Sequence, residues 1–396
     1  MARRFFKHLL SSDSDNPACN KLLALAYRMT DASSNIEDKL LDEEIIAFCN
    51  SELERGEDST IEATLGLLKD EEGTGHDDLL ALAEGCAEFF TDKHGAHLLV
   101  LIPILAWSRY RIIFGKMPEK TAASIANLYK TYFAGTESRI TIGNTLIASE
   151  HLPERLCDVR HLLEKLCTKK KQAGVVDTSY LLSSDPPADF SDVRYITLAA
   201  SAPDAKSLFA DFSAERIKRA RAFMEFALRV QEELREFATG SCLEVQFPSA
   251  FFTAWRQASL AMRLYSLKSL VNYVCLENTT SADLVATTAI FSIVSNEKQQ
   301  EMQPELRIGI SLKTERNKIV AGVVWPCDPQ ELEIAQSFAG EVLALEGIDT
   351  IFAHEQLFPM EWCEQCGAPL YANPDGLVTH IEKPDTQHNG FAPTLN

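Results

Sequence analysis

The first part of the chain carries apolar residues at the spacing of amphipathic helices. Leu22, Leu25 and Met29 recur at helical intervals behind Asn16 and Pro17, which supply a capping side chain and a helix-opening proline. Further apolar stripes predict helices over residues 36–53, 61–68 and 79–90. Residues 1–95 are therefore predicted to form a helical region.

The pattern changes near residue 97, where a continuous apolar run from Leu98 to Trp107 has the length of a buried strand. Strands are predicted over residues 98–106, 110–114, 139–148, 193–200, 242–247, 282–294, 306–312, 318–325 and 349–353. Helices are predicted over residues 118–134, 152–170, 214–236, 251–264, 267–276 and 329–346. This mixture predicts an α+β (mixed α/β) fold class.

Turn-forming residues interrupt the pattern around residues 172–192, where the sequence contains two serines, an aspartate and two prolines in succession. We expect a linker there and four parts in the chain. In order, these are an acidic helical region over 1–95, a first α/β unit over 96–200 that includes the linker, a second α/β unit over 201–360, and a C-terminal knuckle with a polar tail over 361–396.

The two α/β units share the order strand, strand, helix, strand. Their closing segments also match at three positions, which are Ala148 with Ala353, Glu150 with Glu355, and Leu152 with Leu357. The match raises the possibility of an internal duplication, whereas chance similarity between two strand exits is the simpler explanation. A duplication requires related sheet topologies over residues 97–153 and 305–359.

Composition restricts the class of protein. The chain has 396 residues, of which 46% are hydrophobic and 24% charged, and this is typical of a globular protein. The formal net charge of −19 argues against a nucleic-acid partner, because such proteins usually present a basic surface. No segment has the ~18 uncharged residues of a membrane span, so no membrane association is expected.

The compartment is predicted from the N-terminus and the cysteines. The apolar stretch behind Met1 is interrupted by Lys7 and His8, which makes it too short for a secretory signal. We therefore expect a cytoplasmic protein whose ten cysteines are mostly reduced. Eight of them lie singly among apolar neighbours, which is typical of buried free thiols.

Much of the negative charge falls within residues 1–95. Acidic residues on amphipathic helices usually form a solvated surface. The alternative is an acidic docking surface for a basic protein partner.

One motif has a spacing that carries chemistry. Cys363 and Cys366 form a Cys-x-x-Cys-Gly element, which is typical of a zinc knuckle because a tight turn lets both thiolates reach one ion. Gly367 permits the positive φ that such a turn needs. A turn with two free thiols is the main alternative. A dithiol redox centre is less favoured, because Pro369 opposes the helix that would lower a thiol pKa.

One cysteine pair does not complete a tetrahedral zinc site. His380 is the first choice for a further ligand, because the turn at Asn373-Pro-Asp-Gly is predicted to fold residues 377–380 back toward the cysteines. His388, His354 and Cys327 are the other nearby candidates, and a homodimer that shares one ion is a further possibility. Since no catalytic group lies close in sequence, the zinc is expected to be structural.

The motif belongs to a wider combination of segments, which are Arg3-Arg-Phe with Lys7 and Leu9-Leu10, Ile104 to Tyr110, Asp192-Val-Arg-Tyr195, Arg307-Ile-Gly309, Gly322 to Pro326, Phe358-Pro359, and Cys363 to Gly376. This combination, which spans most of the chain, resembles a family of uncharacterised betaproteobacterial proteins, a domain of unknown function with a C-terminal CxxCGAPLY-type motif. The resemblance implies that the cysteine pair and His380 form one unit. It ranks Cys327 lower, because other members carry an apolar residue there.

Two functional hypotheses follow. The first is a binding or regulatory protein with a structural zinc knuckle. The second is an enzyme that acts on a small anionic molecule in a cleft between the two α/β units, with Arg109, Arg111 and Arg194 as anion-binding candidates. Acid and base groups also adjoin at Glu150-His151 and His354-Glu355, although neighbours in sequence point in different directions along a strand. No residue is therefore assigned a catalytic role.

Overall fold

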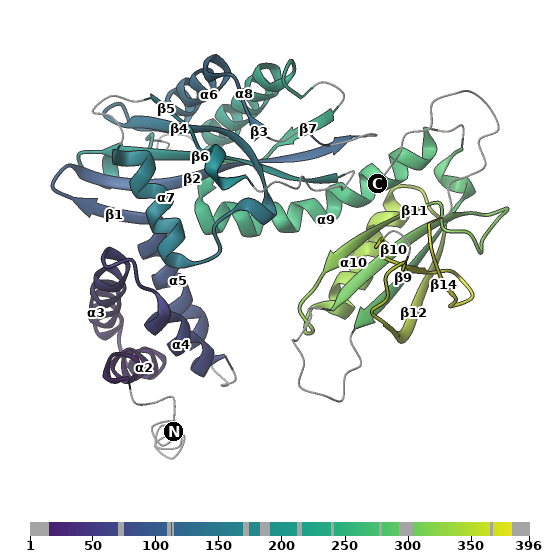
Figure 1. The fold of residues 1–396 in the computed structure, drawn as a ribbon, viewed down its shortest axis with the longest axis horizontal. Coiled ribbons are helices and arrows are strands. Elements are labelled where there is room, and N and C mark those ends of the chain that lie inside the picture. Colours follow the sequence, from purple (N-terminus) through teal and green to yellow (C-terminus); the bar gives the residue numbers. More distant parts are fainter. Residues whose placement is uncertain are drawn as a thin grey trace.

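Two large β-sheets, each covered by helices, form the body of the part of the chain that the structure describes (Figure 1). The computed structural model describes residues 16–69, 75–108, 112, 115–168, 174–182, 191–211, 216–238, 241–276, 279–292, 304–364 and 367–381. The predicted strand over residues 110–114, except residue 112, and much of the predicted linker lie outside these residues. The α+β fold class is confirmed. None of the described helices combines the length and apolar character needed to cross a membrane.

The N-terminal part is helical, as predicted. Its helices are α2 (Pro17–Thr30), α3 (Asn35–Glu54), α4 (Ser59–Leu68) and α5 (Gly75–Glu88). The side chain of Asn16 caps α2 by accepting the N–H of Ala18 at 3.0 Å, which confirms the predicted start. The prediction was wrong at the end of α5, because Phe89 and Phe90 lie in a strand that pairs with residues 97 and 98. Pairing across this hairpin decides their conformation, and a helical stripe does not reveal it.

The first sheet has the order β1-β2-β6-β4-β3, and three short strands pair beside it. The bounds are β1 (Phe89–Asp92), β2 (Gly95–Ser108), β3 (Gly115–Lys116), β4 (Arg139–Ala148), β5 (Gly174–Val176), β6 (Ser191–Ala202), β7 (Ser241–Val245) and β8 (Ser249–Ala250). The division expected at residue 200 falls inside β6. Strands β7 and β8, from the expected second unit, pair with β2 in this first sheet.

Helices cover both faces of the first sheet. Helices α6 (Glu119–Tyr132) and α8 (Arg216–Leu234) pack on one face, and α7 (Leu156–Thr168) packs with the N-terminal helices on the other (Figure 1). Along β2, Val100 and Ile102 belong to the first of these cores, whereas Leu99 and Leu101 belong to the second. Burial on both faces explains why this strand is apolar at successive positions.

Helix α9 (Phe251–Cys275) connects the two sheets (Figure 1). Two helices were predicted for this segment, and that prediction was wrong because the sequence holds no glycine or proline that would end the first one. The apolar stripe changes sides because Phe251 and Ala258 pack into the core of the first sheet, whereas Leu267 and Leu270 pack into that of the second.

The second sheet has the order β11-β10-β9-β12. Its strands are β9 (Leu284–Ser292), β10 (Glu305–Leu312), β11 (Ala321–Pro326) and β12 (Thr350–Pro359). Helix α10 (Leu332–Leu345) and the second half of α9 cover one face of this sheet. A small hairpin of β13 (Tyr371–Ala372) and β14 (Val378–Thr379) packs against the other face (Figure 1).

The two units differ in topology despite their shared order of elements. In the first sheet, β2 and β4 flank β6, and both run antiparallel to it. In the second, β10 runs antiparallel to β9, whereas β12 runs parallel to β9. The arrangement therefore argues against an internal duplication, and the matched residues are similar only as strand exits.

Candidate functional site

The chain reverses direction at the predicted knuckle. The N–H of Cys363 donates to the carbonyl of Ala368 at 2.8 Å, and the N–H of Gly367 donates back to the carbonyl of Cys363 at 2.8 Å. Gly367 has a φ of 70°, the left-handed conformation that the sequence led us to expect there. Cys363 is half-buried in this turn, and Cys366 lies outside the described residues. The backbone turn therefore has the reversal that a Cys-x-x-Cys zinc knuckle needs.

A hairpin follows the knuckle, as predicted from the Asn-Pro-Asp-Gly turn. Tyr371 pairs with Thr379 in the β13–β14 ladder. The side-chain oxygen of Asn373 accepts the N–H groups of Asp375 and Leu377 at 3.1 and 2.9 Å, and this closes the turn. Strand β14 thus runs from the turn back toward the knuckle.

His380 directly follows β14, at the knuckle end of the hairpin. Its ring is exposed, and Nδ1 lies 2.7 Å from the carbonyl of Ile381. Because a carbonyl only accepts, Nδ1 carries the proton and the lone pair of the neutral ring is on Nε2. Histidines that bind zinc commonly donate their second nitrogen to such a carbonyl. The donor chemistry of His380 therefore fits a zinc ligand.

The other ligand candidates lie elsewhere. His354 donates from Nε2 to the carbonyl of Asn373 at 2.9 Å, so it contacts the turn at the opposite end of the hairpin from the knuckle. Cys327 is fully buried in the core beneath α10, where burial raises the pKa of its thiol. His388 lies outside the described residues. Within the described ranges, which omit Cys366 and His388, no three His, Cys, Asp or Glu side chains are grouped as metal ligands.

Arg307 anchors the knuckle to the second sheet. Its side chain is fully buried, and Nη1 donates to the carbonyls of Glu361 and Leu370, both at 2.7 Å. These two residues lie just before and just after the turn that contains Cys363. One guanidinium on a central strand therefore joins both ends of the knuckle.

The charge of Arg307 is compensated where it is buried. Its guanidinium lies 2.8 Å from the carboxylate of Glu305, and it is placed over the ring of Phe291 with 4.3 Å to the centroid. The ring of Trp362, within the knuckle, lies 5.5 Å away. Sequence reasoning did not single out Arg307 as a site residue. The sequence signal that could have identified it is the pair Glu305 and Arg307, an acidic and a basic residue two positions apart and so on one face of an apolar strand.

Tyr371 holds the hairpin against the same sheet. Gly309 and Gly322 are paired across β10 and β11, and a Cβ at Gly322 would overlap the ring of Tyr371. Tyr371 is only 3% exposed. The glycines therefore create the space into which the aromatic residue of the C-terminal motif packs.

Of the arginine candidates for an anion site, the one that lies within the described residues, Arg194, is not on the surface. Arg194 is fully buried in β6 and donates to the carboxylate of Asp192. Burial raises the pKa of Asp192, and the adjacent Arg194 acts in the opposite direction. Arg109 and Arg111 lie outside the described residues. Arg194 is therefore part of an internal ion pair, in which a buried charge is compensated.

Of the two acid–base pairs, Glu150 and His151 lie in a short 3-10 helix (Ser149–His151), and only His354 and Glu355 lie in a strand, β12. Glu150 is exposed whereas His151 is buried, so the two side chains do not share a surface. His354 is half-buried and Glu355 is exposed. Neither pair presents an acid and a base to one site.

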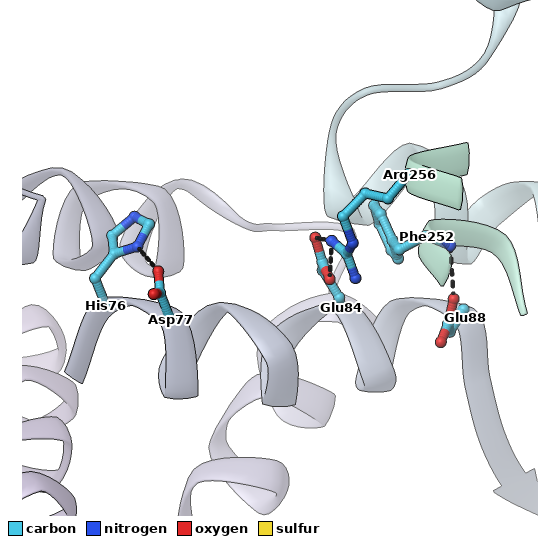
Figure 2. A network of polar contacts seen from close by, with 6 residues as sticks. All are labelled: His76, Asp77, Glu84, Glu88, Phe252 and Arg256. Atoms are coloured by element: carbon cyan, nitrogen blue, oxygen red, sulfur yellow. Dashed lines mark hydrogen bonds and ion pairs between the residues drawn. The ribbon is translucent and has the colours of Figure 1, made fainter. Parts of the chain in front are cut away.

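Part of the acidic region is bonded inward, to α9 (Figure 2). Arg256 donates to both carboxylate oxygens of Glu84 at 2.7 Å, and Glu88 accepts the N–H of Phe252 at 2.9 Å. Burial raises the pKa of Glu88 to about 7, although its hydrogen bond from Phe252 acts against this. These contacts attach α5 to the helix that connects the two sheets.

The fold and the anchored knuckle define an α+β protein with a C-terminal Cys-x-x-Cys element. The family model described as protein of unknown function (DUF2863) matches residues 8–392. The chain belongs to this family, in agreement with the resemblance to a domain of unknown function. No curated protein and no solved structure matches the chain.

Proposed function

We propose that the protein is a cytoplasmic binding or regulatory protein whose C-terminal knuckle holds one structural zinc ion through Cys363, Cys366 and His380. The observation that carries the proposal is the attachment of both ends of the knuckle to the sheet by Arg307. A zinc ion there would link His380, at the end of the hairpin, to the two cysteines of the knuckle. The fourth ligand would be His388 or a residue of a second copy in a homodimer.

The thiol chemistry of the chain supports the cytoplasmic part of the proposal. All cysteines that can be placed are free thiols, and several of them are buried among apolar side chains. Free buried thiols suit a reducing compartment. Cysteine thiolates and a histidine are also the donor set that structural zinc prefers.

The acidic helical region supplies the proposed docking surface. Ile36 and Leu40 lie one helical turn apart on α3, and their side chains are 75% and 58% exposed. Glu43 and Glu44 are exposed on the next turn of this helix. An exposed apolar ridge beside carboxylates suits a basic amphipathic segment of a protein partner.

Metal analysis tests the zinc part of the proposal. Protein purified without chelators is expected to contain about one zinc per chain, and Cys363→Ser or Cys366→Ser is expected to bring the content close to zero. Cys242→Ser, which changes an exposed cysteine far from the knuckle in sequence, is the control and should keep the zinc. A wild-type content near zero would contradict the proposal.

Affinity purification from the native cells tests the docking surface. Replacing Ile36 and Leu40 by Asp should abolish recovery of a basic partner that high salt also releases. Met224 and Leu228 form a comparable exposed apolar pair on α8, so their replacement by Asp is the matched control and should leave recovery unchanged. Equal loss in both variants, or no effect in either, would contradict docking on α3.

A further inference from the structure

Three polar side chains meet at one end of the first sheet. Asp92 is the last residue of β1, His97 lies near the start of β2, and Ser201 lies near the end of β6. His97 and Ser201 are directly opposite each other in the β2–β6 ladder. Nδ1 of His97 is 2.8 Å from Oγ of Ser201, and Nε2 is 3.1 Å from the carboxylate of Asp92. The imidazole therefore bridges a hydroxyl and a carboxylate.

The partners decide where the imidazole proton lies. A carboxylate only accepts, so Nε2 of the neutral ring carries the proton and donates it to Asp92. Nδ1 is then the acceptor, and the hydroxyl of Ser201 donates to it. This is the relation between nucleophile, base and orienting carboxylate that activates a serine, with the two ring nitrogens in exchanged roles.

The surroundings hold the imidazole in this orientation. The ring of Phe90 packs against that of His97 with centroids 4.7 Å apart, and the His97 side chain is only 6% exposed. Asp92 also accepts the N–H of His94 at 2.7 Å. Burial acts to raise the pKa of Asp92, but the hydrogen bonds from His94 and His97 outweigh it, so the pKa lies below its ordinary value. Asp92 is therefore ionised at neutral pH.

A thiol and a cation complete the surroundings of Ser201. Sγ of Cys167, near the end of α7, is 3.8 Å from Oγ of Ser201. Burial raises the pKa of Cys167 to about 11, so this thiol stays protonated, whereas Oγ of Ser201 is hydrogen-bonded to the base His97. Ser201 also pairs with Arg139 in the β4–β6 ladder, so it lies between His97 on β2 and Arg139 on β4. The side chain of Arg139 is exposed.

We propose that Ser201, His97 and Asp92 form a hydrolytic centre for small esters that carry an anionic group. Ser201 is the nucleophile, His97 is the general base, and Asp92 is a positioning residue that orients His97. The cation of Arg139 attracts the anionic substrate. This activity goes beyond the proposed binding function and does not depend on zinc.

The reaction balances without a cofactor. Oγ of Ser201 forms a bond to the ester carbonyl carbon while its proton passes to Nδ1 of His97. The bond from that carbon to the alcohol oxygen breaks, and the alcohol leaves with the proton from His97. A water molecule then gives a proton to His97 and attacks the acyl carbon, which releases the carboxylic acid and returns the proton to Ser201.

A fluorophosphonate probe on the full-length protein tests the nucleophile directly. Oγ of Ser201 would displace fluoride from phosphorus, and mass spectrometry would locate the adduct on the peptide that contains Ser201. Ser201→Ala is expected to abolish labelling, and His97→Gln to slow it by at least about 100-fold. Ser191→Ala, at the other end of the same strand, is the matched control and should label like the wild type.

The remaining outcomes overturn the proposal. No labelling of the folded wild type, labelling at another residue only, or labelling unaffected by His97→Gln would each contradict it. If Ser201→Ala failed to fold, the position of the adduct in the wild type would still decide. For Asp92→Asn, hydrolysis of a p-nitrophenyl ester with a terminal carboxylate should lose at least about tenfold in kcat with KM nearly unchanged, whereas a merely structural role would leave kcat per folded molecule unaltered.

Discussion

The guanidinium of Arg307 donates at 2.7 Å to the carbonyl of Leu370, a residue 63 positions further along the chain. Through this bond and its counterpart to Glu361, the C-terminal knuckle is attached to the central part of the second sheet. The same side chain compensates the carboxylate of Glu305. The knuckle is therefore an integral part of the fold in the described residues.

Removal of this anchor should destabilise the protein strongly. Arg307→Leu leaves the partly buried carboxylate of Glu305, whose side chain is 18% exposed, without its counter-charge and two carbonyls without their donor. We expect the free energy of unfolding to fall by about 3–5 kcal/mol, measured by urea denaturation. Arg316→Leu, on an exposed loop, should change it by less than about 0.5 kcal/mol. Similar values for the two variants would refute the anchoring role.

A methyl group at Gly322 should displace the hairpin. Gly322→Ala places a Cβ against the ring of Tyr371, and we expect a loss of about 1–3 kcal/mol in thermal or urea unfolding. Gly340→Ala is the matched control, because no atom lies near its Cβ and alanine favours the helix, so it should be neutral or stabilising. The cost of Gly322→Ala should shrink when Tyr371 is also replaced by Ala. Full additivity of the two changes would contradict the contact.

Ser266 should stabilise the junction between α9 and the second sheet. Its hydroxyl accepts the indole N–H of Trp325 at 2.9 Å in a buried contact. Ser266→Ala leaves that N–H without its partner, so we expect a loss of about 1–3 kcal/mol, accompanied by a change in tryptophan emission. Ser259→Ala removes a hydroxyl from an exposed position of the same helix and should have little effect. The idea fails if both variants unfold alike.

Glu88 should make stability depend on pH. Burial raises its pKa from the ordinary value of 4.5 to about 7 in the folded protein. The folded state therefore binds the proton more tightly, and the stabilising contribution of this group is complete below about pH 4.5 and is lost as pH rises through 7. Relative to Glu88→Gln, the wild type should lose up to about 3 kcal/mol between these values in urea unfolding. A difference that stays constant with pH would contradict the shift.

Local pattern predicted most of the elements. The cap and proline at Asn16 and Pro17 start α2, the strand predicted over residues 139–148 is β4, and the turn after Asn373 forms the predicted hairpin. In each case the deciding residues lie within a few positions of one another. Errors arose where strand pairing and packing decide: Phe90 pairs with His97 across a hairpin, and the two halves of α9 pack into different cores.

The sequence by itself determined the α+β class, the main helices and strands, and the knuckle turn, because periodicity, caps and glycine conformations act over short distances along the chain. Only the tertiary structure decided that α9 serves both cores, that the two units differ in topology, and that Arg307 holds the knuckle. It also placed His97 against Ser201, 104 residues away. Side chains so distant in sequence are joined by strand pairing and packing, and a single sequence carries no local signal for either.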